Sequence, residues 1–135
     1  MITYIDQNLQ PEHINQVRQA VGWRALDEAR YAEALQKTVY ALMAYDGNRP
    51  VGLARLIGDG ICYVIVDVAV DPAYQKQGIG KTLVLQLLEY VRRQLDKDQD
   101  CTILLNASYG KEDFYQKLGF QKMHTGTGMQ LILSR

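Results

Sequence analysis

Hydrophobic residues along the chain alternate between strand-like runs and helix-like spacing. Residues 2–5, Ile-Thr-Tyr-Ile, predict a short first strand. Pro11 then begins a segment with apolar residues at helical spacing, and Gly22 is expected to end this helix. Residues 26–37 predict a second helix whose apolar stripe is incomplete. The chain therefore opens with one strand and two helices.

The next part of the sequence predicts antiparallel strands. Residues 39–45 and 50–57 are rich in apolar side chains and flank Asp46-Gly47-Asn48, which favours a β-hairpin. After a second glycine-containing turn, residues 61–70 form a run in which Asp67 is the single charge. Such a run is typical of a strand that is covered on both faces.

The last part of the sequence predicts both helices and strands. Residues 78–95 carry apolar side chains on one helical face, and residues 101–105 read as another buried strand. We expect a short helix over 108–118 that Ser108 caps and Gly119 ends, and then an antiparallel pair of strands at 120–123 and 129–133. This order predicts an α/β (α+β) chain with a strand-helix-strand crossover in its middle.

Composition narrows the function classes. A chain of 135 residues favours a single domain spanning 1–135, and 15 Lys and Arg against 15 Asp and Glu give no global field for nucleic acid or a membrane surface. The two cysteines are not spaced as Cys-x-x-Cys, so we expect reduced, buried thiols, and neither they nor the two histidines imply a metal site. The N-terminal residues do not resemble a signal peptide, which predicts a cytoplasmic protein.

A glycine-rich turn between the strand at 61–70 and the following helix carries the most specific chemistry. Glycines ahead of a helix allow close approach of a ligand to the backbone, and free amides at the positive end of the helix dipole favour a phosphate. A triphosphate-binding P-loop needs a glycine where Gln75 stands, and a dinucleotide fingerprint needs one where Leu83 stands. Both of these nucleotide motifs are therefore incomplete.

The same turn resembles the acyl-CoA motif of the GNAT superfamily of N-acetyltransferases. Gln75, Gly78 and Gly80 match the pattern Arg/Gln-x-x-Gly-x-Gly/Ala. The preceding Val-Ala-Val-Asp-Pro-x-Tyr at 68–74 and the Phe-Tyr-Gln-Lys-Leu-Gly-Phe at 114–120 are also similar to hallmarks of that family. The resemblance implies a mixed, mostly antiparallel sheet of six to seven strands, flanked by about four helices, with a central β-α-β crossover that binds acyl-CoA.

The resemblance also assigns ligand contacts. Backbone amides of the turn would hold the pyrophosphate of acetyl-CoA, the preceding strand would pair with the pantetheine arm, and Asn106 would contact that arm. Lys81 and Thr82 would lie near the outer phosphate oxygens. The expected acetyl-CoA contacts are Val68, Ala69, Val70, Gln75, Lys76, Gln77, Gly78, Ile79, Gly80, Lys81, Thr82, Asn106 and Tyr115.

Two residues are candidates for catalysis. Asp67 is a carboxylate in an otherwise apolar strand, so it is a candidate general base, with an ion pair to Arg55 or simple exposure as structural alternatives. Some family members use a strand glutamate at the position of Val64, so a water chain is the other route for the proton. Tyr115 corresponds to the family tyrosine that protonates the leaving thiolate, and core packing is its structural alternative.

By this resemblance, the protein transfers the acetyl group of acetyl-CoA to a primary amine of a small molecule or peptide, by direct attack in a ternary complex and without a metal. Trp23, Arg24 and Tyr31 fall where acceptor pockets form in the family. Two alternatives stay open: a non-catalytic CoA-binding regulatory module, and a nucleotide-binding switch that uses Gly80-Lys81-Thr82. A homodimer is a candidate assembly, since many relatives are dimers.

Overall fold

The computed structural model describes residues 1–135 as two compact units, Met1–Leu105 and Asn106–Arg135, each of which is described by itself below. The first unit contains five strands, three α-helices and one short 3-10 helix. In chain order these are β1 (Ile2–Ile5), α1 (Pro11–Ala20), α2 (Glu28–Gln36), β2 (Tyr40–Asp46), β3 (Arg49–Gly58), β4 (Cys62–Val70), η1 (Pro72–Tyr74), α3 (Ile79–Gln94) and β5 (Thr102–Leu104). The second unit contains α4 (Glu112–Gln116).

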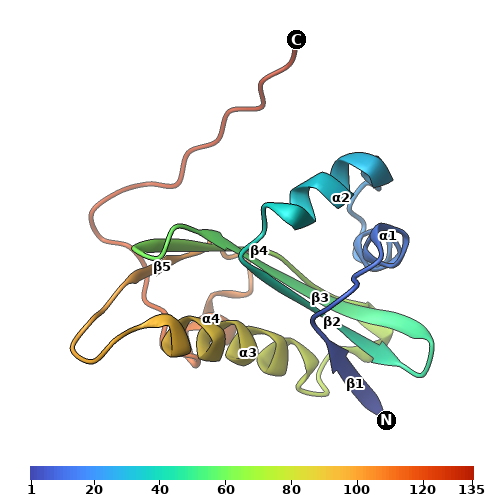
Figure 1. The fold of residues 1–135 in the computed structure, drawn as a ribbon, viewed down its shortest axis with the longest axis horizontal. Helices are drawn as coiled ribbons and strands as arrows, with labels where there is room; N and C mark the ends of the chain where they lie inside the picture. Colours follow the sequence, from blue (N-terminus) through green and yellow to red (C-terminus); the bar gives the residue numbers. More distant parts are fainter. The chain divides into compact units, whose positions relative to one another are not determined.

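The five strands form one sheet in the order β1-β2-β3-β4-β5. Neighbouring strands are antiparallel except for β4 and β5, which are parallel and are joined through α3 (Figure 1). The predicted hairpin at 39–57 and the predicted strand-helix-strand crossover are therefore confirmed, as is the mixed α/β class. The second helix starts later than expected because the side chain of Asp27 accepts a hydrogen bond from the Arg30 amide and so caps it.

Helices cover both faces of the sheet in the first unit (Figure 1). On one face, Ile14 and Val17 of α1 and Tyr31 of α2 pack with buried residues of the sheet such as Leu53. On the other face lies α3, and a Cβ added to Gly52 would come within 3.1 Å of the Leu83 side chain. Glycine at this position lets the helix lie close to β3.

The second unit differs most from the sequence expectations. Its helix spans only Glu112–Gln116, and Ser108 does not cap it, because Lys111 occupies the N-cap position. The expected strand pair at 120–123 and 129–133 was wrong, since neither segment forms a strand and the side chains of residues 129–133 are exposed. An isolated pair of strands is marginally stable without a third strand or a core, and this unit offers neither. The sheet accordingly has five strands rather than six or seven.

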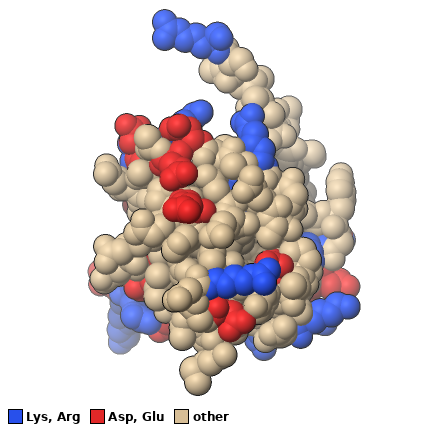
Figure 2. Space-filling model, turned by 90° about the vertical axis from the view of Figure 1, so that its right-hand side faces the viewer, with Lys and Arg blue, Asp and Glu red and all other residues tan.

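Cys62 and Cys101 are free thiols, but they are half-buried rather than buried: Cys62 is the first residue of β4, and Cys101 directly precedes β5. His, Cys, Asp and Glu side chains form no group of three that could hold a metal ion. None of the helices combines the length and the hydrophobicity that a membrane-spanning helix needs. Figure 2 shows several acidic side chains gathered at the upper left of the face that it presents, with acidic and basic side chains mixed in its lower part.

Candidate functional site

A β-bulge interrupts the pairing of β3 with β4. Leu53 pairs with Ala69 and Arg55 pairs with Val66, so two residues of β4, Asp67 and Val68, lie opposite one residue of β3. Asp67 adopts a left-handed backbone conformation with φ +55°, which aspartate tolerates better than most residues. A bulge of this kind bends its strand and redirects a side chain. The extra residue therefore explains how a carboxylate is accommodated in this apolar strand.

Beyond the middle of β4, one edge of the strand has no neighbour. β5 pairs with β4 only from Cys62 to Val64, whereas β3 stays paired with β4 as far as Val70. The edge at residues 65–70 thus leaves backbone groups without a strand partner, and at its end Gln75 Nε2 donates to the Val70 carbonyl at 3.0 Å. Such an edge can pair with an extended ligand as if the ligand were a strand.

The loop that follows β4 presents a row of unpaired amides. Lys76 and Gly78 both have positive φ, +64° and +83°, and Gly78 is the N-cap of α3 without any side-chain cap. No backbone amide from Lys76 to Lys81 donates a hydrogen bond within the protein; the first helical bond runs from the Thr82 amide to the Gly78 carbonyl at 3.0 Å. Successive free amides at a helix N-terminus favour an anion.

Side chains from β2, β3 and η1 hold the start of this loop. Arg49 donates from Nη2 to Asp71 Oδ2 at 3.0 Å and lies over the ring of Tyr74. The Asp71 side chain is nearly buried and its Oδ1 accepts from the Ala73 amide, while the hydroxyl of Tyr74 donates to Asp46 at 2.6 Å. We term Arg49, Asp46, Asp71 and Tyr74 the loop anchor. Sequence reasoning missed it, because its members are separated by up to 28 residues.

Asp67 lies in a cluster of charged and phenolic groups on the α1 and α2 side of the sheet. Its Oδ1 accepts from Arg18 Nη1 at 3.3 Å, and its Oδ2 accepts from Arg55 Nε at 3.1 Å and from the Tyr31 hydroxyl. Burial and the hydrogen bond to Asp67 raise the pKa of Tyr31. We term Arg18, Tyr31, Arg55 and Asp67 the bulge cluster. The ion pair with Arg55 matches the structural alternative expected from the sequence.

Arg18 is the member of the bulge cluster that sequence reasoning did not single out. It follows buried Ile14 by four residues and buried Asn15 by three, so helical periodicity already placed it on the covered face of α1. An arginine on such a face needs an acidic partner, and Asp67 was the one charge in the strand run. An arginine on the covered face of α1 together with a lone acidic residue in the strand was the sequence signal that could have paired Arg18 with Asp67.

The second unit holds the other two predicted site residues. Tyr115 lies on α4, packs edge-on against Phe114 and Phe120, and burial raises its pKa. A tyrosine hydroxyl is protonated at neutral pH even at its ordinary pKa, so Tyr115 has a proton to donate with or without this shift. Asn106 is exposed and follows β5 by two residues. Their proposed contacts with acetyl-CoA stay predictions.

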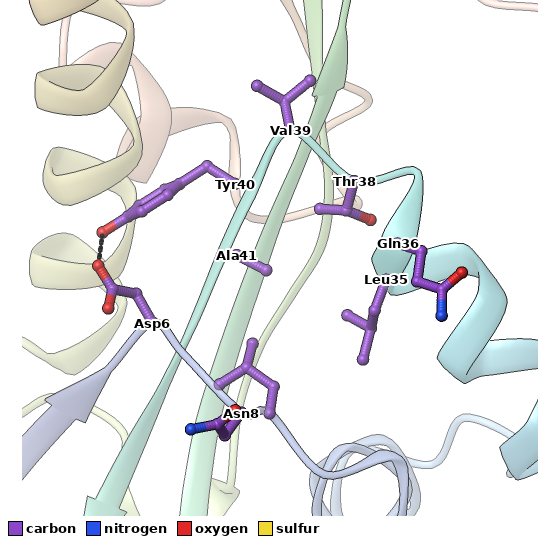
Figure 3. Close-up of a pocket in the computed structure, with 9 residues that line it drawn as sticks. Asp6, Asn8, Leu35, Gln36, Thr38, Val39, Tyr40 and Ala41 are labelled. Atoms are coloured by element: carbon purple, nitrogen blue, oxygen red, sulfur yellow. Dashed lines mark hydrogen bonds between the residues drawn. The ribbon is translucent and has the colours of Figure 1, made fainter.

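A pocket of about 300 Å³ lies between the start of β2 and the end of α2 (Figure 3). Tyr40 contributes to its wall, donates to Asp6 Oδ2 at 2.8 Å and stacks on Tyr90 at 4.5 Å between ring centroids. Burial and the bond to Asp6 raise the pKa of Tyr40 to about 12. Thr38, which also lines the pocket, accepts from Arg55 Nη1 at 3.1 Å, so the pocket adjoins the bulge cluster.

An open strand edge beside a row of free amides is the kind of surface that suits an extended ligand ending in phosphates. Comparisons with known proteins give the family. Residues 6–130 match the model of the acetyltransferase (GNAT) domain. The chain is 37% identical over 117 residues to GCN5-related N-acetyltransferase 1, chloroplastic, of Arabidopsis thaliana. The match covers 84% of this chain and 57% of that relative, so the chain spans little more than half of the relative's length.

Solved structures give the same result. A GNAT family acetyltransferase from Streptococcus pneumoniae is 30% identical with a TM-score of 0.78, and the match covers 100% of both chains. A probable acetyltransferase from Staphylococcus aureus, 24% identical, shares the fold with a TM-score of 0.87 over 99% of this chain and 100% of that one. The chain therefore belongs to the GNAT acetyltransferase family.

Proposed function

We propose that this protein transfers the acetyl group of acetyl-CoA to a primary amine of a small molecule or peptide. The observation that carries the proposal is the open edge of β4 at residues 65–70, which leads directly into the free amides of residues 76–81. The pantetheine arm would pair with Val68 and Val70, and the oxygens of the pyrophosphate would accept hydrogen bonds from the amides. This pattern fits acetyl-CoA better than a nucleoside triphosphate, which has no extended arm.

The chemistry is a direct acyl transfer. The neutral amine attacks the thioester carbonyl, a C–N bond forms, and the C–S bond breaks as the tetrahedral intermediate collapses. Backbone amides near Val68 would stabilise the oxyanion, since an irregular strand can direct an amide away from its ladder. The hydroxyl of Tyr115 would give its proton to the departing thiolate of CoA.

The amine must lose a proton before it attacks, and the contacts of Asp67 bear on the route. Three donors already use its two carboxylate oxygens, so a substrate ammonium would meet at most one free acceptor position. We therefore favour a water chain over direct proton abstraction by Asp67. On this proposal, Asp67→Asn lowers kcat/KM at all pH values, whereas loss of a direct base would remove the ascending limb of the pH profile.

Binding and turnover test the proposal separately. CoA and acetyl-CoA should raise the Tm, while ATP or GTP with magnesium should not; preferential stabilisation by the nucleotides would instead favour a nucleotide switch. Acetyl-CoA incubated with a panel of primary amines should release free CoA, detected with a thiol reagent. CoA binding with no release above background across amines and lysine peptides would support the non-catalytic binding module.

Assembly and location stay predictions. A homodimer predicts a mass in solution of twice the chain, which light scattering after size exclusion measures. The composition has 15 basic and 15 acidic residues, so we expect no binding to nucleic acid or to anionic vesicles. The cytoplasmic location expected from the sequence is tested by fractionation of the source cells.

A further inference from the structure

The bulge cluster carries more positive than negative charge. Arg18 and Arg55 both pair with Asp67, and neither arginine forms an ion pair with any other acidic side chain. Their side chains are 13% and 17% exposed and that of Asp67 is 18% exposed, so the surplus charge is held in a largely covered position. A charge that is only partly solvated attracts a counter-ion more strongly than one at the open surface.

Each arginine also keeps one nitrogen, Nη2, that makes no hydrogen bond. Arg18 uses Nε on the Arg24 carbonyl and Nη1 on Asp67, and Arg55 uses Nε on Asp67 and Nη1 on Thr38. The Nη2 groups have no partner within the protein, and no buried polar side-chain atom lacks one, so both Nη2 groups reach solvent. The structure thus presents two oriented donors beside Asp67.

Aromatic contacts fix both guanidinium groups in place. Arg18 lies over the ring of Trp23 at 5.3 Å, and Arg55 lies over the ring of Tyr31 at 5.4 Å. Because the side chains are already ordered, a ligand that binds them loses little of its binding energy to their immobilisation. Two fixed donors with one surplus charge suit a monovalent carboxylate better than a doubly charged phosphate.

We infer that the bulge cluster binds a carboxylate of the acceptor, so that the preferred amines are those of amino-acid-like molecules. The inference rests on the proposed function and deepens it. Asp67 directly precedes Val68, at which the open edge of β4 is proposed to hold the pantetheine arm. A carboxylate held by Arg18 and Arg55 would therefore lie near the thioester end of that arm, with the amine of the same molecule free to attack.

Matched pairs of amines that differ only in the carboxylate test the inference. Lysine with cadaverine, tyrosine with tyramine, and phenylalanine with phenethylamine are compared by kcat/KM for CoA release. We expect the carboxylate-bearing member to be preferred by about tenfold or more, and Arg18→Gln or Arg55→Gln to bring the ratio close to one. Arg93→Gln, which removes an ion-paired arginine from the exposed surface of α3, is the matched control and should keep the ratio.

A ratio near one in the unmodified protein, or a preference for the decarboxylated amines, overturns the inference. A ratio that both glutamine variants leave unchanged does so as well, since a purely structural cluster would alter overall rate and stability without changing selectivity. The same amine pairs are also compared by their effect on the Tm of the CoA complex. Stabilisation by only the carboxylate-bearing members supports the inference even if no amine is acetylated, in which case the proposed function alone fails.

Discussion

Replacement of Gly78 by alanine isolates the role of the amide row in binding acetyl-CoA. Gly78 has φ +83°, and a Cβ added there meets nothing within 4 Å, so the substitution introduces backbone strain without a clash. Left-handed geometry costs an alanine about 1–2 kcal/mol relative to glycine, and the stiffer unfolded chain offsets about 0.4–1 kcal/mol of this. The expected net loss in the free energy of unfolding is about 1 kcal/mol.

Gly22 provides a matched control within the same chain. It has φ +85° and likewise nothing within 4 Å of an added Cβ, but it ends α1 rather than beginning α3. Gly22→Ala and Gly78→Ala should therefore lower the Tm by a similar amount, roughly 3–4 °C for a chain of this size. Chemical unfolding and thermal melts of the two variants without ligand check this equality.

The two variants should differ in their affinity for CoA. If the alanine backbone relaxes away from φ +83°, the amides beside it turn away from the pyrophosphate, and loss of one charge-assisted hydrogen bond weakens binding by about tenfold or more. Titration calorimetry should find this loss in Gly78→Ala and an unchanged affinity in Gly22→Ala. Equal CoA affinity in both variants and the unmodified protein would refute the assignment of the loop as the phosphate site.

Tyr115, Arg49 and Tyr40 each give a further testable prediction. Tyr115→Phe should lower kcat by about 100-fold while the affinity for CoA stays within about twofold, as kinetics and calorimetry together show. Arg49→Gln removes the ion pair to Asp71 in the loop anchor, so the KM for acetyl-CoA should rise by roughly 3-fold to 10-fold with kcat unchanged. The pKa of Tyr40 is raised from 10.0 to about 12, so the neutral hydroxyl contributes its full share of the unfolding free energy below pH 10 and this share is lost as the pH approaches 12. Tyr40→Phe should therefore make the unfolding free energy fall less steeply between pH 10 and pH 12, as chemical unfolding at a series of pH values measures.

The predictable part of the fold was the part that local patterns encode. The hairpin at 39–57 and the long helix at 78–95 each have a continuous apolar pattern with a glycine at the boundary, and both formed as expected. The strands predicted at 120–123 and 129–133 have apolar patterns too, but a strand is stabilised by a partner that its own sequence does not specify. An apolar pattern was therefore not sufficient to predict a strand in these two segments.

The candidate site divides in the same way. The turn at 75–82 could be located because glycines and a helix start are local features, and its free amides belong to the backbone. The loop anchor and the bulge cluster each join residues of three or more separate elements, so the sequence suggested at most single pairs, such as Arg55 with Asp67, and not the complete clusters. The sequence did mark Asp67 as an isolated charge, but its meaning depends on partners supplied by α1, α2 and β3.

The bulge at Asp67 and Val68 connects the two halves of the proposed site. Without the extra residue, the alternation of side chains along β4 would place residue 67 and residue 69 on one face in an unbroken ladder. The left-handed φ of Asp67 instead interrupts the ladder where β5 has already separated from β4, and it allows the carboxylate to meet both arginines. A single irregular residue therefore couples the open edge, which would receive the acetyl donor, to the charged cluster, which would select the acceptor. A change that removes the bulge from β4 should weaken the binding of both substrates at once.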